Sequence, residues 1–171
     1  MPGIYLWVLS FSSVLMIILI IFFLWPFLFG APFEPTENKK VTKIIKLANV
    51  KKGDKAVDLG SGDGRIVIEL AKRGAEAHGF EINPFLVLIS RYNIKKAGLK
   101  GKAFIHWKNF WKISLKTYDI VTLFQFKTIM AKLEKKLQKE LKKGSRVVSY
   151  YWQFPNWKAS KKIENIWLYR R

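Results

Sequence analysis

Residues 57–64 read Val-Asp-Leu-Gly-Ser-Gly-Asp-Gly and stand between a predicted strand, 55–59, and a predicted helix, 64–73. Glycines directly after a strand allow the main chain to turn tightly and let a ligand lie against bare backbone at the N-terminus of the helix. In an open α/β sheet, ligands bind in this crevice at the carboxyl ends of the strands. The run therefore predicts a ligand-binding loop inside an α/β fold.

The spacing of the acidic residues narrows the class of ligand. Glu81 ends the next predicted strand, 17 residues after Gly64, where its carboxylate can accept hydrogen bonds from both hydroxyls of a ribose. A dinucleotide loop needs G-x-G-x-x-G, whereas this run is Asp58-x-Gly60-x-Gly62-x-Gly64 and no Gly-Lys-Ser/Thr phosphate-loop sequence follows. Asp58 suits the ammonium group of an amino acid better than a pyrophosphate. The pattern resembles the S-adenosyl-L-methionine (SAM) site of class I methyltransferases.

Elements on both sides of this loop alternate between strands and helices. Strands are expected at 55–59, 76–81, 103–107, 119–124, 146–152 and 163–169, and helices at 36–49, 64–73, 83–98 and 129–141. We expect Thr36 to cap the first of these helices. Strands that alternate with helices imply crossover connections and a mainly parallel sheet covered on both faces. The predicted fold class is therefore α/β, a Rossmann-like class I methyltransferase domain.

The segment before this domain is wholly apolar. Residues 1–33 carry no charged side chain, and the 26 residues from Ile4 to Phe29 would form a helix of about 39 Å, against about 30 Å for a hydrocarbon core. Its serines, at 10, 12 and 13, can donate hydrogen bonds to helix carbonyls. A cleaved signal peptide is disfavoured because no basic region precedes the run and no A-x-A-like site follows it.

We therefore expect a transmembrane helix over 4–29, a linker over 30–36 and a methyltransferase domain over 37–171. Lysines follow the apolar run closely and none precedes it. The positive-inside bias then predicts a single-pass membrane protein with its domain on the cytoplasmic side.

Composition excludes several kinds of chemistry. The chain has no Cys, so it has no disulfide, thiolate nucleophile or Cys-ligated zinc, and its two histidines cannot form a three-His site or an H-E-x-x-H motif. We expect no metal. The 31 Lys and Arg against 12 Asp and Glu give a net charge of +19. Solvated helix faces and attraction to a lipid bilayer are the favoured explanations; nucleic acid is an unlikely partner because no recognised binding module is present.

Longer motifs carry a closer resemblance. These are Asp58-Leu-Gly-Ser-Gly-Asp-Gly-Arg-Ile-Val-Ile68, Gly79-Phe-Glu-Ile-Asn-Pro-Phe85, Ser90-Arg-Tyr92, Leu133-Glu-Lys-Lys-Leu137 and Phe154-Pro-Asn-Trp157. Together, over about 32–169, they resemble the membrane-anchored seven-β-strand protein lysine methyltransferases that act on the adenine nucleotide translocase and the c-subunit of ATP synthase. The resemblance implies a SAM-dependent N-methyltransferase that acts on lysine in a membrane protein.

The expected cofactor-binding residues are Asp58, Gly60, Ser61, Gly62, Gly64, Glu81, Asn83 and Asn109. The chain departs from the family pattern in three places. Asn109 stands where relatives usually carry Asp, and Asn can still accept a hydrogen bond from the adenine amino group. Phe85 replaces a usual Trp, and Gln125-Phe-Lys-Thr128 replaces a proline-containing turn beside the expected methyl-transfer site.

Lysine methylation has an energetic obstacle, because neutralising an ammonium group with a pKa near 10.4 costs about 4.6 kcal/mol at pH 7. An apolar pocket and the cationic sulfonium would lower that pKa, and aromatic faces could guide the ammonium in. The aromatic candidates are Trp111, Tyr150, Tyr151, Trp152 and Trp157. No residue is assigned as the general base. Alternative functions are methylation of a lipid or quinone head group, methylation of RNA or DNA (although an N/D-P-P-Y motif is missing), and SAM binding without catalysis.

Overall fold

The computed structural model describes residues 2–29 and 34–171, with side chains at 5, 7–21 and 34–171. The chain divides into two compact units, with the boundary between Phe33 and Glu34. The first unit contains helix α1, Pro2–Phe29. The serine hydroxyls at positions 10, 12 and 13 donate to helix carbonyls three or four residues earlier, at 2.8–2.9 Å, as predicted.

The prediction of a membrane-spanning helix has to be corrected. Crossing a hydrocarbon core takes about 20 consecutive, predominantly apolar residues. Within residues 2–29 and 34–171, as far as they are described, no helix combines that length with that apolar character. The prediction of a transmembrane helix over 4–29, in a single-pass protein with a cytoplasmic domain, is therefore wrong. Of the predicted linker, 30–36, residues 30–33 lie outside the described residues.

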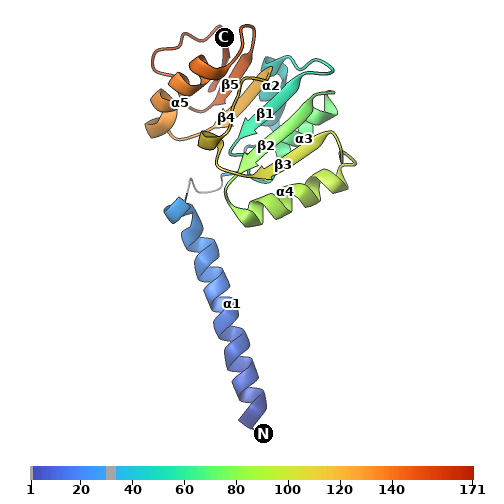
Figure 1. Cartoon of the computed structure of the whole chain (residues 1–171), viewed down its shortest axis with the longest axis vertical. Coiled ribbons are helices and arrows are strands. Elements are labelled where there is room, and N and C mark those ends of the chain that lie inside the picture. The colour runs from blue at the N-terminus through green and yellow to red at the C-terminus, as the bar shows by residue number, and fades with distance from the viewer. Residues whose placement is uncertain (1, 30–33) are drawn as a thin grey trace. The chain divides into compact units, whose positions relative to one another are not determined.

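Within residues 34–171 the strands form one seven-stranded sheet in the order β3-β2-β1-β4-β5-β7-β6 (Figure 1). The strands are β1 Lys55–Leu59, β2 Glu76–Glu81, β3 Ala103–Trp107, β4 Ile120–Phe124, β5 Arg146–Tyr150, β6 Lys161–Ile163 and β7 Ile166–Arg170. The first five run parallel, whereas β7 runs antiparallel to both of its neighbours. The predicted α/β fold with a mainly parallel sheet is confirmed.

Helices cover both faces of this sheet. The helices α2 Asn38–Ala48, α3 Arg65–Lys72 and α4 Pro84–Lys96 pack on one face in a core with strand residues such as Ala56, Ala77 and Ile105. Helix α5, Lys127–Glu140, and the 3₁₀ turn η1, Phe110–Lys112, contribute to the core on the other face, with Val57 and Leu59. Successive strand residues alternate between the two cores because side chains in a strand point to opposite faces.

The predicted last strand, 163–169, is wrong in one respect. The segment is a hairpin of β6 and β7, and Glu164, at its turn, has a φ of 51°. The Glu164 carboxylate accepts hydrogen bonds from the ammonium groups of Lys40 and Lys43 on α2. The hydrogen bonds from these two lysines lower the pKa of Glu164 to about 2. A polar turn residue therefore interrupts the apolar run and joins the sheet edge to a helix.

The start of α2 also differs from the prediction. The residue before the helix is Glu37, which makes no capping hydrogen bond through its side chain. Thr36 is buried, and its carbonyl accepts a hydrogen bond from the Arg65 guanidinium at 2.7 Å. Arg65 also pairs with Asp63 at 2.6 Å. The hydrogen bond from Arg65 thus connects Thr36 to the glycine-rich loop through the Thr36 main chain, and the ion pair with Asp63 holds the guanidinium in place.

Arg146 at the start of β5 joins three segments. Its guanidinium donates to the carbonyls of Ala48, at 2.9 Å, and Asn49, at the end of α2. It also pairs with the Asp54 carboxylate at 2.7 Å. A cation at a helix C-terminus satisfies free carbonyls and interacts favourably with the helix dipole. Since Arg146 is 7% exposed, the pair is a buried one, in which losing one partner leaves an uncompensated charge.

We predict that Arg146→Met lowers the free energy of unfolding by about 3 kcal/mol, because the Asp54 carboxylate and two helix carbonyls lose their partner. Urea unfolding followed by circular dichroism measures this change. Lys143→Met is the control, because Lys143 is exposed in the turn just before β5, and it should change stability by less than about 0.5 kcal/mol. Equal effects of the two substitutions would contradict the role given to Arg146.

Candidate functional site

The glycine-rich loop leaves β1 and turns against the end of β2. The amides of Gly60 and Ser61 donate to the Phe80 carbonyl at 2.9 and 3.2 Å, and the Gly64 amide donates to the Ser61 carbonyl at 2.9 Å. Gly60, Gly62 and Gly64 have φ values of +80°, +53° and +82°. These values lie in the left-handed region that residues with a Cβ adopt only at a cost. The predicted tight turn is therefore present and requires its glycines.

Two of these glycines also allow close packing. A Cβ on Gly60 would lie 2.5 Å from Nε2 of Gln125, and one on Gly64 would lie 2.9 Å from Cβ of Ser90. Gln125 follows β4 and is buried, and its Nε2 donates to the Leu59 carbonyl at 2.7 Å. The side-chain amide of Gln125 thus lies against the bare Cα of Gly60.

The Glu81 carboxylate connects the loop to the next helix. Its Oε2 accepts from the Gly62 amide at 2.9 Å, and its Oε1 accepts from the amides of Ile82 and Asn83 at 2.8 Å each. Glu81 is 8% exposed. Two carboxylate oxygens offer about four acceptor positions, so this group holds the loop and keeps acceptor capacity at the carboxyl end of β2.

The two asparagines of the predicted site both cap helical turns. Asn83 Oδ1 accepts from the amides of Phe85 and Leu86, at 2.9 and 3.4 Å, and caps α4. Asn109 is exposed and its Oδ1 accepts from the Trp111 amide at 2.9 Å, at the start of η1. The amide of Lys108 donates to the Glu81 carbonyl at 3.1 Å. This contact brings the β3–η1 turn beside Glu81, where the sequence predicted Asn109 to act.

Asp58 is a buried acid at the end of β1. Its Oδ1 accepts from the Thr122 hydroxyl at 2.7 Å, and the two residues are register partners on β1 and β4. Burial, together with the negative charges of Glu81 and Asp63, raises the pKa of Asp58 to about 7, although the Thr122 hydrogen bond lowers it. A buried acid with neighbouring carboxylates and one neutral donor is suited to a cationic ligand.

The hydroxyl of Ser61 also indicates a ligand. Among the described residues, Ser61 Oγ is the buried side-chain oxygen or nitrogen that lacks a hydrogen-bond partner. It lies above Gly79, where a Cβ would approach Ser61 Oγ to 2.5 Å and Ile105 Cδ1 to 2.7 Å. An unpaired buried hydroxyl costs free energy unless something bonds to it. Its place in the loop makes a bound ligand the natural partner.

The segment Gln125–Thr128, where the chain departs from the family pattern, lies next to an aromatic cluster. Phe124 packs on Tyr150 and Tyr151, with ring centroids 4.7 and 6.2 Å apart, and Tyr151 contacts Trp152 at 5.0 Å. Lys127 Nζ lies 5.7 Å from the Trp152 ring centroid. We call Phe124, Tyr150, Tyr151 and Trp152 the aromatic cluster. It lies at the carboxyl ends of β4 and β5, the same edge of the sheet as the loop.

The other two aromatic candidates lie outside this cluster. The Nζ atom of Lys132 lies over the Trp111 ring, 4.8 Å from the ring centroid. Trp157 packs on Phe154 and Tyr169, at 5.6 and 5.3 Å. Tyr169 pairs with Val147 near the amino end of β5. Trp157 therefore lies toward the amino ends of the parallel strands, away from the aromatic cluster at their carboxyl ends.

Several contacting residues were not predicted from the sequence. Thr122 is a hydroxyl in the otherwise apolar run Ile120–Phe124, which was a usable signal for a partner to Asp58. Gly79 and Gln125 belong to segments that the sequence analysis named, but their close approach to Ser61 and Gly60 was not predicted, because spacing along the chain does not reveal it. In the described ranges, no group of three or more His, Cys, Asp and Glu side chains is arranged to hold a metal ion.

Comparison with known proteins gives this geometry a context. The ANTKMT methyltransferase domain matches residues 58–161. The chain is 38% identical to the human lysine N-methyltransferase of the ATP synthase c-subunit, over 81% of its own length and 60% of the length of that relative. It is 37% identical to a protein-lysine N-methyltransferase of Saccharolobus islandicus, over 78% of this chain and 84% of that protein.

A solved structure shows the same fold at appreciable identity. The RNA methyltransferase of Salinibacter ruber, in complex with S-adenosyl-L-homocysteine, superposes with a TM-score of 0.75 at 33% identity, covering 80% of this chain and 92% of that one. The family match over residues 58–161 includes both the glycine-rich loop and Glu81, so it agrees with the site that the geometry indicates. The chain belongs to the ANTKMT methyltransferase domain family.

Proposed function

We propose that this chain is a SAM-dependent N-methyltransferase that transfers a methyl group to a lysine of a membrane-associated protein. Residues 37–171 form the proposed catalytic domain. The observation that carries the proposal is the glycine-rich loop whose Gly62 amide is bonded to Glu81, with a buried Asp58 beside it. The family, its lysine methyltransferase relatives and the loop geometry all support it.

The residues present fit SAM. The unpaired Ser61 hydroxyl and the buried Asp58 carboxylate are both polar groups in need of a partner, and an amino-acid ligand supplies an ammonium and a carboxylate. In this proposal Asp58 binds the ammonium, Glu81 the ribose hydroxyls and Asn109 the adenine amino group. Ser61 and the amides of Gly60, Gly62 and Gly64 would line the loop, and Asn83 would hold the start of α4. Bound there, SAM would supply an electrophilic sulfonium methyl group.

The chain must then align and desolvate the target lysine. Tyr151 is 47% exposed, within the aromatic cluster at the carboxyl ends of β4 and β5. Aromatic faces attract an ammonium ion and, by excluding water, favour the neutral amine that attacks. Alignment of the two reacting groups supplies much of the rate acceleration in such reactions. The reaction then needs no assigned general base, because the ammonium attracted to the exposed aromatic cluster can lose its proton to solvent before the amine attacks.

The substrate class rests on the relatives. The human relative is named for the c-subunit of ATP synthase, and we propose an acceptor of the same kind, a membrane-associated protein. A lipid bilayer as a further partner stays a prediction. A second candidate, RNA methylation, is favoured by one observation, the 33% identity to a protein described as an RNA methyltransferase. Lipid or quinone methylation and SAM binding without turnover are the remaining alternatives.

We predict that Glu81→Ala weakens SAM binding about 10- to 100-fold, because the charge-assisted hydrogen bond from ribose to the remaining acceptor position is lost and the Gly62 amide loses the carboxylate that holds the loop. Isothermal titration calorimetry on the full chain measures the affinity. Glu69→Ala is the matched control, since it removes a carboxylate that pairs with Lys72 on α3, and its affinity should equal that of the parent. Unchanged binding in Glu81→Ala would remove the cofactor assignment.

The raised pKa of Asp58 predicts how SAM affinity depends on pH. Only the ionised carboxylate pairs with an ammonium, and the pKa of Asp58 in the free protein is about 7. Affinity should therefore fall about tenfold per pH unit as the pH drops below 7. Calorimetry between about pH 5.5 and about pH 8.5 tests this prediction. Asp58→Asn should bind SAM weakly, and its affinity should not change with pH in this way. A flat profile in the parent protein would contradict the role of Asp58.

The same pKa has a consequence for stability. A carboxyl group whose pKa is higher in the folded than in the unfolded state contributes stability at low pH, and this is lost as the pH rises toward the folded pKa of about 7. Without ligand, Asp58→Asn should gain about 2–3 kcal/mol relative to the parent between pH 5 and pH 8. Urea unfolding at both pH values measures the difference. Because only the change with pH is compared, constant packing effects of the substitution cancel.

Methyl transfer itself is tested by incubating the full chain with membranes and methyl-labelled SAM. We expect label in protein, at lysine, and none above background with Glu81→Ala. The same reaction is extracted into lipid and RNA fractions. Label confined to either of those fractions would replace the proposal by the corresponding alternative, and SAM binding without label in any fraction would favour a non-catalytic protein.

A further inference from the structure

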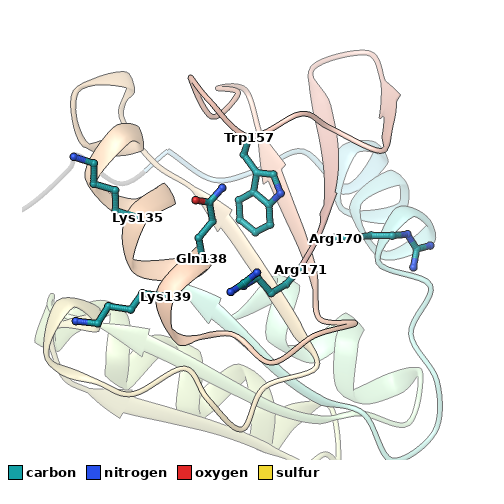
Figure 2. Close-up of a pocket in the computed structure, with 6 residues that line it drawn as sticks. All are labelled: Lys135, Gln138, Lys139, Trp157, Arg170 and Arg171. Carbon is teal, nitrogen blue, oxygen red and sulfur yellow. The ribbon is translucent and has the colours of Figure 1, made fainter.

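A basic pocket of about 550 Å³ lies between α5, the loop before β6 and the end of β7. Its lining residues are Lys135, Gln138, Lys139, Trp157, Arg170 and Arg171. Figure 2 shows Gln138, Trp157 and Arg171 pointing toward one another, while Lys135 and Lys139 extend from α5 and Arg170 points away from the others. Because the Arg170 guanidinium points away, the lining combines three cations, those of Lys135, Lys139 and Arg171, with one amide and one indole.

These cations lack acidic partners, unlike their neighbours. On or next to the same helix, Lys136 pairs with Glu140 at 2.7 Å and Lys142 pairs with Asp119. Within residues 34–171, the part of this unit that the structure describes, Lys135, Lys139, Arg170 and Arg171 form no ion pair. The buried Glu134 does not compensate for them through an ion pair, and its Oε2 instead accepts from the Asn156 amide at 3.0 Å.

The walls of the pocket are held in place before any ligand arrives. The Trp157 indole stacks on Phe154 at 5.6 Å and contacts Tyr169. The main chain of Arg171 is bonded on both sides, since its amide donates to Ser145 at 2.9 Å and its carbonyl accepts from Gly144 at 2.7 Å. A pocket with preformed walls loses less entropy when it binds a ligand.

The pocket lies near the amino end of β5, whereas the glycine-rich loop lies at the carboxyl ends of the parallel strands. Arg170 is the register partner of Arg146, the first residue of β5, whereas the loop follows the last residue of β1, which runs parallel to β4 and hence to β5. A ligand in the pocket therefore does not occupy the cofactor site.

We propose that this pocket binds a nucleoside polyphosphate. Several unpaired cations around one cavity match the repeated negative charge of a polyphosphate, and Arg guanidinium groups bind phosphate through paired hydrogen bonds. The volume lies in the range of small-molecule pockets and exceeds what a single phosphate group needs. The indole of Trp157 offers a surface for a base, and the Gln138 amide can donate to it and accept from it.

The test is calorimetric titration of ATP into the full chain, with and without S-adenosyl-L-homocysteine. We expect one ATP to bind per chain, equally in both cases. Arg171→Gln and Lys139→Gln should each weaken binding about tenfold through the loss of a charge-assisted hydrogen bond. Lys143→Gln removes the same charge from an exposed residue outside the lining and should change affinity less than about twofold. Adenosine should not bind, and pyrophosphate should bind more weakly than ATP.

The contrary outcomes are distinct. Competition between S-adenosyl-L-homocysteine and ATP would place ATP in the cofactor site. Equal losses in Lys143→Gln and Arg171→Gln would show attraction to net charge alone. Equal affinity for pyrophosphate and ATP would remove the nucleoside, and tighter binding of a single-stranded RNA than of ATP would point to a nucleic-acid surface. Each of these results overturns the proposal. Because Glu81→Ala should keep its ATP affinity, failure of the cofactor assignment and failure of this inference are separable.

Discussion

The three hydrogen bonds accepted by the Glu81 carboxylate organise the functional part of the fold. One oxygen receives the Gly62 amide from the loop after β1, and the other receives the amides of Ile82 and Asn83 at the start of α4. These amides lie in a tight turn and just before a helix, where the main chain offers them no regular acceptor. Without the carboxylate each amide would carry a desolvation cost. The buried Glu81 carboxylate therefore holds the loop after β1 against the end of β2 and the start of α4. The other groups of the site lie on these same segments.

Asp58 shows why such a site is costly without its ligand. The residue is buried beside two other acids and has one hydroxyl donor from Thr122. Burial without a cation raises its pKa, so the folded protein is less stable with Asp58 ionised than with it neutral. The unpaired hydroxyl of Ser61 adds a second unmet group in the same loop. A cationic amino-acid ligand would satisfy both groups, and without it the ionised Asp58 and the unpaired Ser61 hydroxyl each lower the stability of the free protein.

Charge is divided unevenly over the domain. At the loop the acids Asp58, Asp63 and Glu81 lie close together, whereas the basic pocket at the opposite edge of the sheet holds cations without acidic partners. Such a separation favours a cationic ligand at one edge and an anionic ligand at the other. The net charge of +19 therefore does not describe the electrostatic character of either site.

The sequence by itself determined the order of elements, the parallel core of the sheet and the loop with its acids, because glycine placement and apolar periodicity are local signals. It did not determine the hairpin at the sheet edge, where Glu164 turns the chain and binds lysines of α2, nor the main-chain role of Thr36. The apolar composition of residues 4–29 led to a membrane span that the described helices do not support. Tertiary structure alone decided that Gln125 lies against Gly60, that Thr122 bonds to Asp58 and that Trp157 lies away from the aromatic cluster. The physical reason is that these contacts join residues far apart in the chain, and the register of neighbouring strands brings them together.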